Sequence, residues 1–224
     1  MTKAILAGFV ALNAAFISMG ADGQSAVAKT VEWPLDSLAT IGGHPVTVAG
    51  TPRLVDTEIG KAVEFNGKTD GLFLDINPLA GLERFTIETV FAPAAGGPDE
   101  QRFVHFEEAD TGNRALIELR MVAGASWHLD TYLRWGDAMS TLIDPDARHS
   151  AGEWHVAALT YDGRTMTHYV NGVRERSGDV GFRPLGAGVT SIGVRRNRVS
   201  WFMGRIRLIR ITPDALPAER LQRR

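Results

Sequence analysis

The chain of 224 residues contains no cysteine. This absence excludes disulfide bonds, thiolate metal sites and cysteine nucleophiles, so any chemistry falls to histidine and carboxylate side chains. An excess of charge of one sign is lacking too, because 24 Lys and Arg stand against 26 Asp and Glu, a formal net charge of −2. Without an overall positive field, the sequence does not favour nucleic acid or an anionic membrane as a partner.

Long hydrophobic runs are scarce, and the one at residues 4–19 follows Lys3 directly. It has about the length of a signal-peptide core and is short for a membrane span. The small-x-small sequence at 26–28 predicts cleavage after it. We therefore interpret residues 1–28 as a signal peptide and 29–224 as one exported domain, periplasmic or extracellular. An uncleaved anchor helix or an ordinary buried helix is the alternative.

The rest of the chain is punctuated by 24 Gly and 10 Pro, a density that suits many short strands. Segments rich in β-branched and aromatic residues lie at 46–48, 62–65, 72–76, 85–91, 102–107, 116–121, 127–135, 154–161, 165–170, 191–194 and 202–211. Asp162-Gly163, between two of these segments, indicates a tight hairpin. The pattern predicts an all-β fold, a sandwich of two antiparallel sheets, with a short helical turn within 214–221.

Several of these segments resemble a known family. Residues 60–67, Asp70 and 72–74 are similar to the opening of a laminin-G-like domain of the concanavalin A-like lectin/glucanase superfamily, as is 85–88. Its most recognisable stretch resembles 154–157, 160–163 and 169–172, and its closing strand resembles 202–206 and 215–216. The resemblance covers about residues 31–221 and implies a jelly-roll sandwich. It implies no single activity, because the superfamily includes lectin modules, adhesion domains, glycosidases and polysaccharide lyases.

Alternation along the strands predicts which side chains enter the core. Phe65, Trp154 and Val156 are expected to face the space between the sheets. His155 is either a solvated strand residue or a polar group on the side of the sheet opposite Trp154.

Read with a period of two, three segments place polar side chains outward. With Ile117 and Leu119 inward, Glu118 and Arg120 lie outward. In 102–107, Val104 and Phe106 are expected inward and Phe103 outward, with the opposite register as the close alternative. If the three strands are neighbours, one outer surface carries His105, Glu107, Glu118, Arg120, His128, Asp130, Tyr132 and Arg134.

Two interpretations of this surface remain open. It is either an ordinary polar face stabilised by cross-strand pairs such as Glu118 with Arg134, or a face that binds a ligand. The residue types favour binding, because this face carries arginine and no lysine, and the arginine fork matches carboxylates and sugar hydroxyls. The resemblance implies a concave groove for glycans there. The expected ligand-binding residues are Glu107, His128, Asp130, Arg134, His155, Arg195 and Asn197.

The basic stretch 195–198, with Trp201 close behind it, either binds an anionic glycan at the end of the groove or is solvated charge. The loop carboxylates Asp137, Asp144 and Asp146 are the candidates for a Ca²⁺ site. Their spacing lacks the regularity of a dedicated calcium loop.

Enzyme signatures match only in part. The paired carboxylates of sandwich glucanases are absent, because Val122 stands four residues after Glu118. Residues 117–120 and 103–105 look similar to motifs of jelly-roll alginate lyases, but their order is reversed and the third motif has no match. The catalytic candidates, if the protein is an enzyme, are His105, Glu118, Arg120 and Tyr132.

In a lyase, Arg120 would neutralise the uronate carboxylate, and His105 or Tyr132 would remove the C5 proton. The leading hypothesis is an exported sandwich that binds a polysaccharide, and the composition of its outer face suits an acidic one. The alternative is a polysaccharide-cleaving enzyme, a uronate lyase before a glycoside hydrolase. A protein-adhesion module is the third reading.

Overall fold

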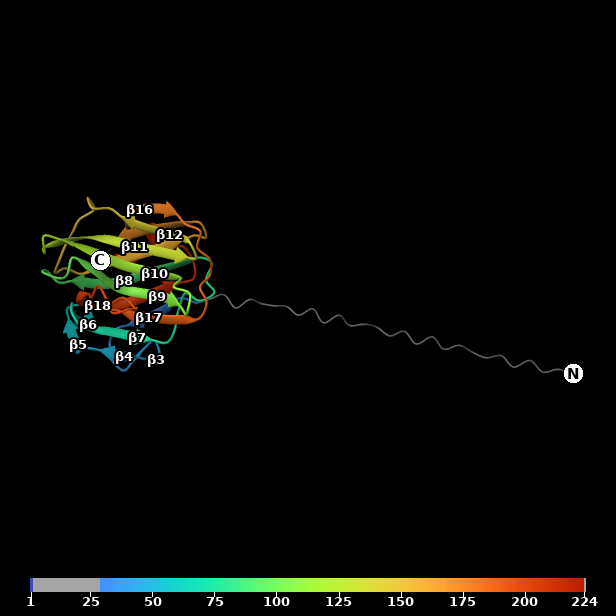
Figure 1. The fold of residues 1–224 in the computed structure, drawn as a ribbon, viewed down its shortest axis with the longest axis horizontal. Helices are drawn as coiled ribbons and strands as arrows, with labels where there is room; N and C mark the ends of the chain where they lie inside the picture. The colour runs from blue at the N-terminus through green and yellow to red at the C-terminus, as the bar shows by residue number, and fades with distance from the viewer. Residues whose placement is uncertain (2–28, 224) are drawn as a thin grey trace.

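The computed structural model describes Met1 and residues 29–223, and two antiparallel sheets packed face to face form its body (Figure 1). The expected all-β sandwich is thereby confirmed. The expected signal peptide lies outside the described residues. Within the part of the chain that is described, no helix has the length and apolar character needed to span a membrane.

One sheet, called here the β8 sheet, combines strands from the first part of the described chain with strands from its last part. Its strands, in spatial order, are β16 (Val173–Asp179), β15 (Thr165–Val170), β14 (His155–Tyr161), β8 (Phe85–Pro93), β18 (Met203–Thr212), β6 (Gly60–Asn66) and β5 (Arg53–Thr57), with β1 (Val31–Pro34) also paired to β18.

The other sheet, the β10 sheet, carries the central segments of the sequence. Its order is β12 (Ala138–Ile143), β11 (Ser126–Trp135), β10 (Arg114–Val122), β9 (Glu100–Glu108), β17 (Gly188–Ile192), β7 (Gly71–Leu74) and β4 (Thr47–Ala49), with β13 (His149–Ser150) also paired to β11. A small hairpin joins β2 (Thr40–Ile41) to β3 (His44–Pro45). The expected C-terminal helical turn is a single 3₁₀ turn, Ala218–Arg220.

The turns follow from their residues. β14 and β15 pair as a hairpin across Asp162-Gly163, as expected, and Gly163 has a φ of 99°. At the next turn, Asn171 and Gly172 have φ values of 52° and 78°. Two successive left-handed residues give the type I′ geometry that matches the twist of the paired strands.

The core lies between the sheets and is aromatic at its centre. Phe91 of the β8 sheet stacks on Phe103 of the β10 sheet with ring centroids 4.4 Å apart, and Trp127 and Phe202 pack around them. All four side chains are fully buried. Burial of a large side chain contributes about 1.5–3 kcal/mol, so this cluster is a main source of stability in a chain without disulfides.

The expected inward orientation is wrong for Trp154 and Val156, at the start of β14. Phe65 does enter the main core, but Trp154 and Val156 belong to a small separate cluster on the outer side of the β8 sheet, where Arg205 covers the Trp154 ring at 5.2 Å. Every residue of β14 is buried, so alternation of polar and apolar residues could not set the phase. His155 consequently faces inward.

A second correction concerns β9. Phe103, expected outward, is in the core, because a β-bulge shifts the register between Ile117 and Glu118 of β10. The extra residue on β9 puts both Phe103 and Val104 on the core side. His105, Phe106 and Glu107 keep the orientation that the sequence predicted.

Candidate functional site

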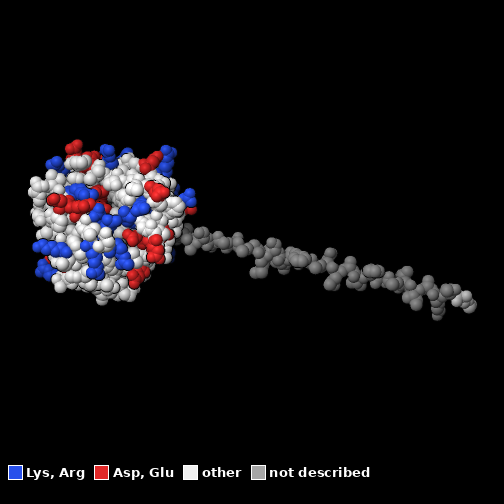
Figure 2. Space-filling model, viewed as in Figure 1, with Lys and Arg blue, Asp and Glu red and all other residues white. Residues whose placement is uncertain are grey.

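The outward side of β9, β10 and β11 forms one continuous polar surface, called here the polar face. The three strands are neighbours, as expected, and their registers align Glu118 with both Arg102 and Asp130. Arg114 is aligned with both Glu107 and Arg134. In Figure 2, basic and acidic side chains are interleaved over the middle of the side shown.

The bulge adds Arg102 to this face, and sequence reasoning missed it. With Val104 inward, a strict period of two would also point Arg102 inward. The additional residue, Phe103, changes the phase, so the residues of β9 that precede it point to the opposite sides from those that the period predicts. Glu100 is brought outward in the same way and lies close to two arginines. No feature of the local sequence marks the bulge, so alternation alone gave the wrong side for this end of β9.

Five charged side chains form a connected network at the centre of the polar face. Arg102 Nε lies 2.9 Å from Glu118 Oε2, and its terminal nitrogen lies 2.6 Å from Glu100 Oε1. Arg120 lies 2.8 Å from Asp130 Oδ2 and 3.0 Å from the same oxygen of Glu100. Arg102 also donates to the hydroxyl of Ser200. The network holds both arginines in place and covers the two carboxylates beneath them.

Glu118 and Asp130 are almost completely buried, although they point away from the core. Burial, and after it the neighbouring charge of Asp130, raise the pKa of Glu118 to about 7 against the opposing effect of Arg102. The pKa of Asp130 is also raised by burial, while its bonds to Arg120 act in the opposite direction. The expected pair of Glu118 with Arg134 does not form, because Glu118 is aligned with Asp130 and Arg134 with Arg114.

The network forms one side of a pocket of about 200 Å³ that is rich in arginine. Its lining includes Arg114, Tyr132 and Arg195, and Arg114 lies over the Tyr132 ring at 4.9 Å. Burial lowers the pKa of Arg114, and the charges of Arg195 and Arg134 lower it further. Among the described residues, none of these three arginines forms a salt bridge.

Three lining residues of this pocket carry buried atoms without a hydrogen-bond partner in the described part of the protein. They are the donors Nε of Arg102 and Nε of Arg114 and the acceptor Oδ1 of Asp130. Arg102 Nε still lies 2.9 Å from the Glu118 carboxylate, which leaves Arg114 Nε and Asp130 Oδ1. Buried polar groups are almost always satisfied, so an unpaired donor and an unpaired acceptor at one pocket mark it as a place where a bound molecule or water completes the hydrogen bonds.

The two histidines of the polar face are poor proton acceptors. His105 is buried, its Nδ1 accepts from the backbone of Arg196 at 3.0 Å, and its Nε2 lies 3.1 Å from Glu107 Oε2. Burial lowers the pKa of His105 below its ordinary value, although Glu107 acts in the opposite direction. Burial also lowers the pKa of His128.

The remaining expected site residues are separated from one another. Arg195 lines the pocket, whereas Asn197 is exposed on the loop that follows β17. His155 is not on the polar face at all: it is buried on β14 of the other sheet and packs edge-on against Trp127 at 5.1 Å. Its place in this set of residues was an error, because the phase of β14 was read one residue out.

The calcium candidates do not come together. Within the described residues, no group of three or more His, Asp or Glu side chains is arranged to hold a metal ion. Asp144 instead accepts from the backbone of Asp146 at 3.1 Å, an ordinary turn contact.

A larger pocket, of about 630 Å³, lies at the ends of β6, β8 and β18. Most of its charged groups already have partners: Arg53 pairs with Glu64, and Asp70 accepts from the backbone of Thr51 at 2.8 Å. Arg205 is stacked on Trp154. The smaller pocket on the polar face, with its unpaired atoms, is therefore the better candidate site.

Comparison with solved structures shows the same fold in several proteins. Domain 4 of the extracellular GH43 arabinanase AbnA from Geobacillus stearothermophilus, solved with arabinotriose, is 21% identical with a TM-score of 0.59, over 85% of this chain and 95% of that domain. A heptameric pentraxin from Limulus polyphemus is 14% identical with a TM-score of 0.58, over 70% of this chain and 77% of its own.

The binding domain of botulinum neurotoxin DC, solved with SialylT, is 12% identical, with a TM-score of 0.62. The match covers 85% of this chain and 49% of that one. No curated protein matches the sequence. A family model described as the concanavalin A-like lectin/glucanases superfamily matches residues 66–222, which is most of the chain. The protein therefore belongs to the concanavalin A-like lectin/glucanase superfamily, in its laminin G branch.

Proposed function

We propose that this protein is a carbohydrate-binding domain and that its polar face binds an acidic saccharide. The observation that carries the proposal is the group of Arg114, Arg134 and Arg195 near Tyr132, none of which forms a salt bridge within the described residues. The one carboxylate that acts on Arg114 and Arg195 is Glu107, which is paired with His105. A carboxylate or sulfate on a sugar supplies a counter-ion, and the arginine fork binds it with two parallel hydrogen bonds. The Tyr132 ring offers an apolar surface to the sugar beside it.

The unpaired pocket atoms support the same ligand. The Nε of Arg114 lacks an acceptor and the Oδ1 of Asp130 lacks a donor, and a sugar carboxylate or hydroxyl pairs with these covered atoms once the neighbouring side chains move aside. The similar structures support the proposal that the ligand is a saccharide, because the arabinanase domain was solved with arabinotriose and the neurotoxin domain with SialylT.

The geometry favours binding over cleavage. A lyase needs a base that reaches the substrate, but the His105 side chain has no exposed surface and Glu107 and the Arg196 backbone lie against its nitrogens. Arg120, the residue that would neutralise the uronate, is already held by Asp130 and Glu100. The Tyr132 hydroxyl donates to Met139 Sδ at 3.5 Å, and among the described residues no basic side chain forms a hydrogen bond with it.

Isothermal titration calorimetry with oligogalacturonates and with neutral arabino-oligosaccharides tests the proposal. We expect the acidic series to bind more tightly, and Arg114→Ala to weaken that binding by roughly ten-fold or more, the value of a charge-assisted contact. Arg176→Ala, an exposed arginine on β16 of the other sheet, is the matched control and should bind as the wild type does.

Failure of both series to bind would refute the proposed function. Equal losses in Arg114→Ala and Arg176→Ala would refute the site. A parallel assay follows the ultraviolet absorbance of unsaturated uronides and the appearance of reducing ends. We expect neither signal; both signals together would favour a lyase, and reducing ends alone a hydrolase.

A further inference from the structure

A row of cross-strand partners connects the pocket of the polar face to the far edge of the β10 sheet. Each residue of the row is aligned with the next, and all lie on the outward side of the sheet. From β12 to β4 the row reads Thr141, Tyr132, Leu116, His105, Ser191, Phe73 and Thr47.

At the far end of this row, a second pocket of about 420 Å³ is lined by Trp201 and Arg198, together with residues 48–50 and Thr69. The guanidinium of Arg198 lies over the Phe73 ring at 5.4 Å, which places it on the outward side of the sheet. Trp201 is half-buried, so part of its ring is open to this pocket. An aromatic ring beside a cation is the combination that suits the apolar face and the charge of an acidic sugar.

The loop 195–200 lies between the two pockets and is held firmly against the sheet. The Arg196 backbone donates to His105, and the backbone of Arg102 donates to the Ser200 carbonyl at 2.9 Å. Arg198 and Ser200 have φ values of 60° and 57°, a left-handed conformation that is unfavourable for residues other than glycine. A loop kept in this conformation by its anchors holds Arg195 toward one pocket and Arg198 toward the other.

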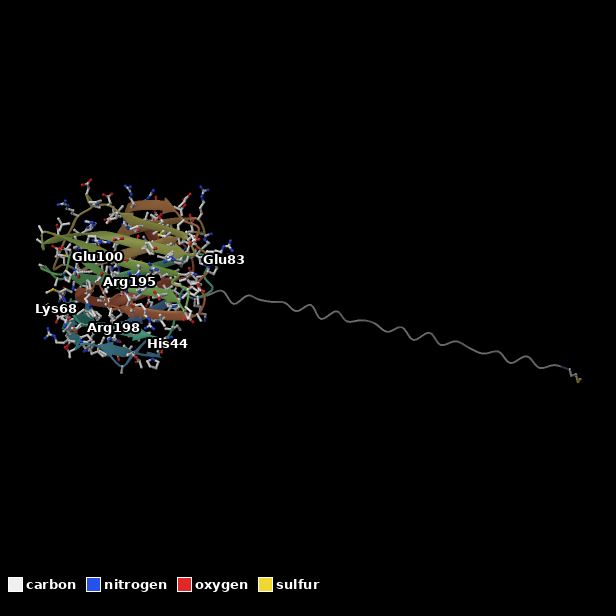
Figure 3. The ribbon with its side chains drawn as sticks, viewed as in Figure 1. His44, Lys68, Glu83, Glu100, Arg195 and Arg198 are labelled. Carbon is white, nitrogen blue, oxygen red and sulfur yellow. The ribbon has the colours of Figure 1, made fainter. Side chains whose placement is uncertain are left out.

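The charge along the loop is of one sign. Arg195, Arg196 and Arg198 form no salt bridge with any described residue. Figure 3 shows Arg195 near the middle of the viewed side and Arg198 below it. A ligand that crosses the loop therefore meets cationic groups along its path.

We propose that Arg198 and Trp201 form a second saccharide subsite, and that the ligand is a polyanionic oligosaccharide long enough to occupy both pockets. This inference rests on the proposed function. Phe73 lies three strands from Leu116 and four strands from Tyr132. At ~4.8 Å for each strand spacing, the distance is roughly 14–19 Å. A pyranose residue has about the length of one strand spacing. A chain of about four or five acidic sugars reaches from one pocket to the other.

Calorimetric titration with oligogalacturonates of one to six residues tests the second subsite. For the wild type, we expect affinity to rise about ten-fold or more between the dimer and the pentamer and then to level off. Arg198→Ala and Trp201→Ala should keep the affinity for the dimer and lose most of that gain. Arg114→Ala should weaken the dimer and the pentamer alike, and Arg176→Ala should leave both unchanged.

The outcomes separate the two proposals. If the dimer and the pentamer bind equally well, or if Arg198→Ala retains the full gain with length, the second subsite is refuted while the first remains. If no oligomer binds to the wild type, the proposed function fails and the subsite with it. Arg198 is exposed, so its variant tests the proposal even if the truncation of Trp201 disturbs the fold.

Discussion

Replacing Glu118 by Gln should make the protein more stable at alkaline pH. The folded protein holds a proton on this buried carboxyl more tightly than the unfolded chain does, because burial and Asp130 raise its pKa from 4.5 to about 7. Between these two pH values the folded state binds more protons, so the free energy of unfolding falls as the pH rises. The interval corresponds to roughly 3 kcal/mol, all of it lost above the folded-state pKa.

Gln removes the charge and keeps an oxygen that can accept from Arg102 Nε, which lies 2.9 Å from the present carboxylate. We therefore expect Glu118→Gln and the wild type to have similar free energies of unfolding near pH 5. By pH 8 the variant should be more stable by about 2–3 kcal/mol. Urea unfolding at several pH values, followed by tryptophan fluorescence, measures the difference directly.

Glu107→Gln is a control of opposite sign. The contact with His105 lowers the pKa of Glu107, so its carboxylate stabilises the fold above its ordinary pKa of 4.5, and this stability is lost as the pH falls through the lower folded-state value. This variant should be less stable than the wild type at pH 5 and at pH 8. A Glu118→Gln protein that is less stable than the wild type at pH 8, or whose difference does not change with pH, would refute the reasoning.

Three further results are expected. Phe103→Ala should reduce the free energy of unfolding by ~3–5 kcal/mol, because this ring is fully buried against Phe91. Arg134→Ala should change the free energy of unfolding little, and equal losses for the two variants in chemical denaturation would contradict the assigned faces. Acidic-glycan binding should weaken between 50 and about 500 mM salt, since exposed charges are screened, and a salt-independent affinity would argue against an ionic site. N-terminal sequencing of exported protein should begin after residue 28; a chain that retains Met1 would overturn the export hypothesis.

The fold was predictable from the sequence because its signals are local. Turn residues such as Asp162 and Gly163 mark hairpins, and the strands of the polar face alternate between apolar and polar residues. For β10 and β11 this alternation predicted the correct side for Glu118, Asp130 and Tyr132.

The sequence failed where alternation carries no information. β14 is apolar on both of its sides, so Trp154 and His155 were assigned to the wrong faces or left open. The bulge at Phe103 depends on the pairing of β9 with β10, and it determines that Arg102 joins the network. The opposition of Glu118 and Asp130 likewise depends on register, which neither strand reveals alone.

The most direct test of the central claim is a map of amide chemical-shift changes in labelled protein titrated with a pentagalacturonate. If the polar face binds acidic saccharides, the largest changes should fall on Arg114, Tyr132 and the loop 195–200, on the outward side of the β10 sheet. Changes confined to the larger pocket near Arg205, at the ends of β6, β8 and β18, would contradict the account.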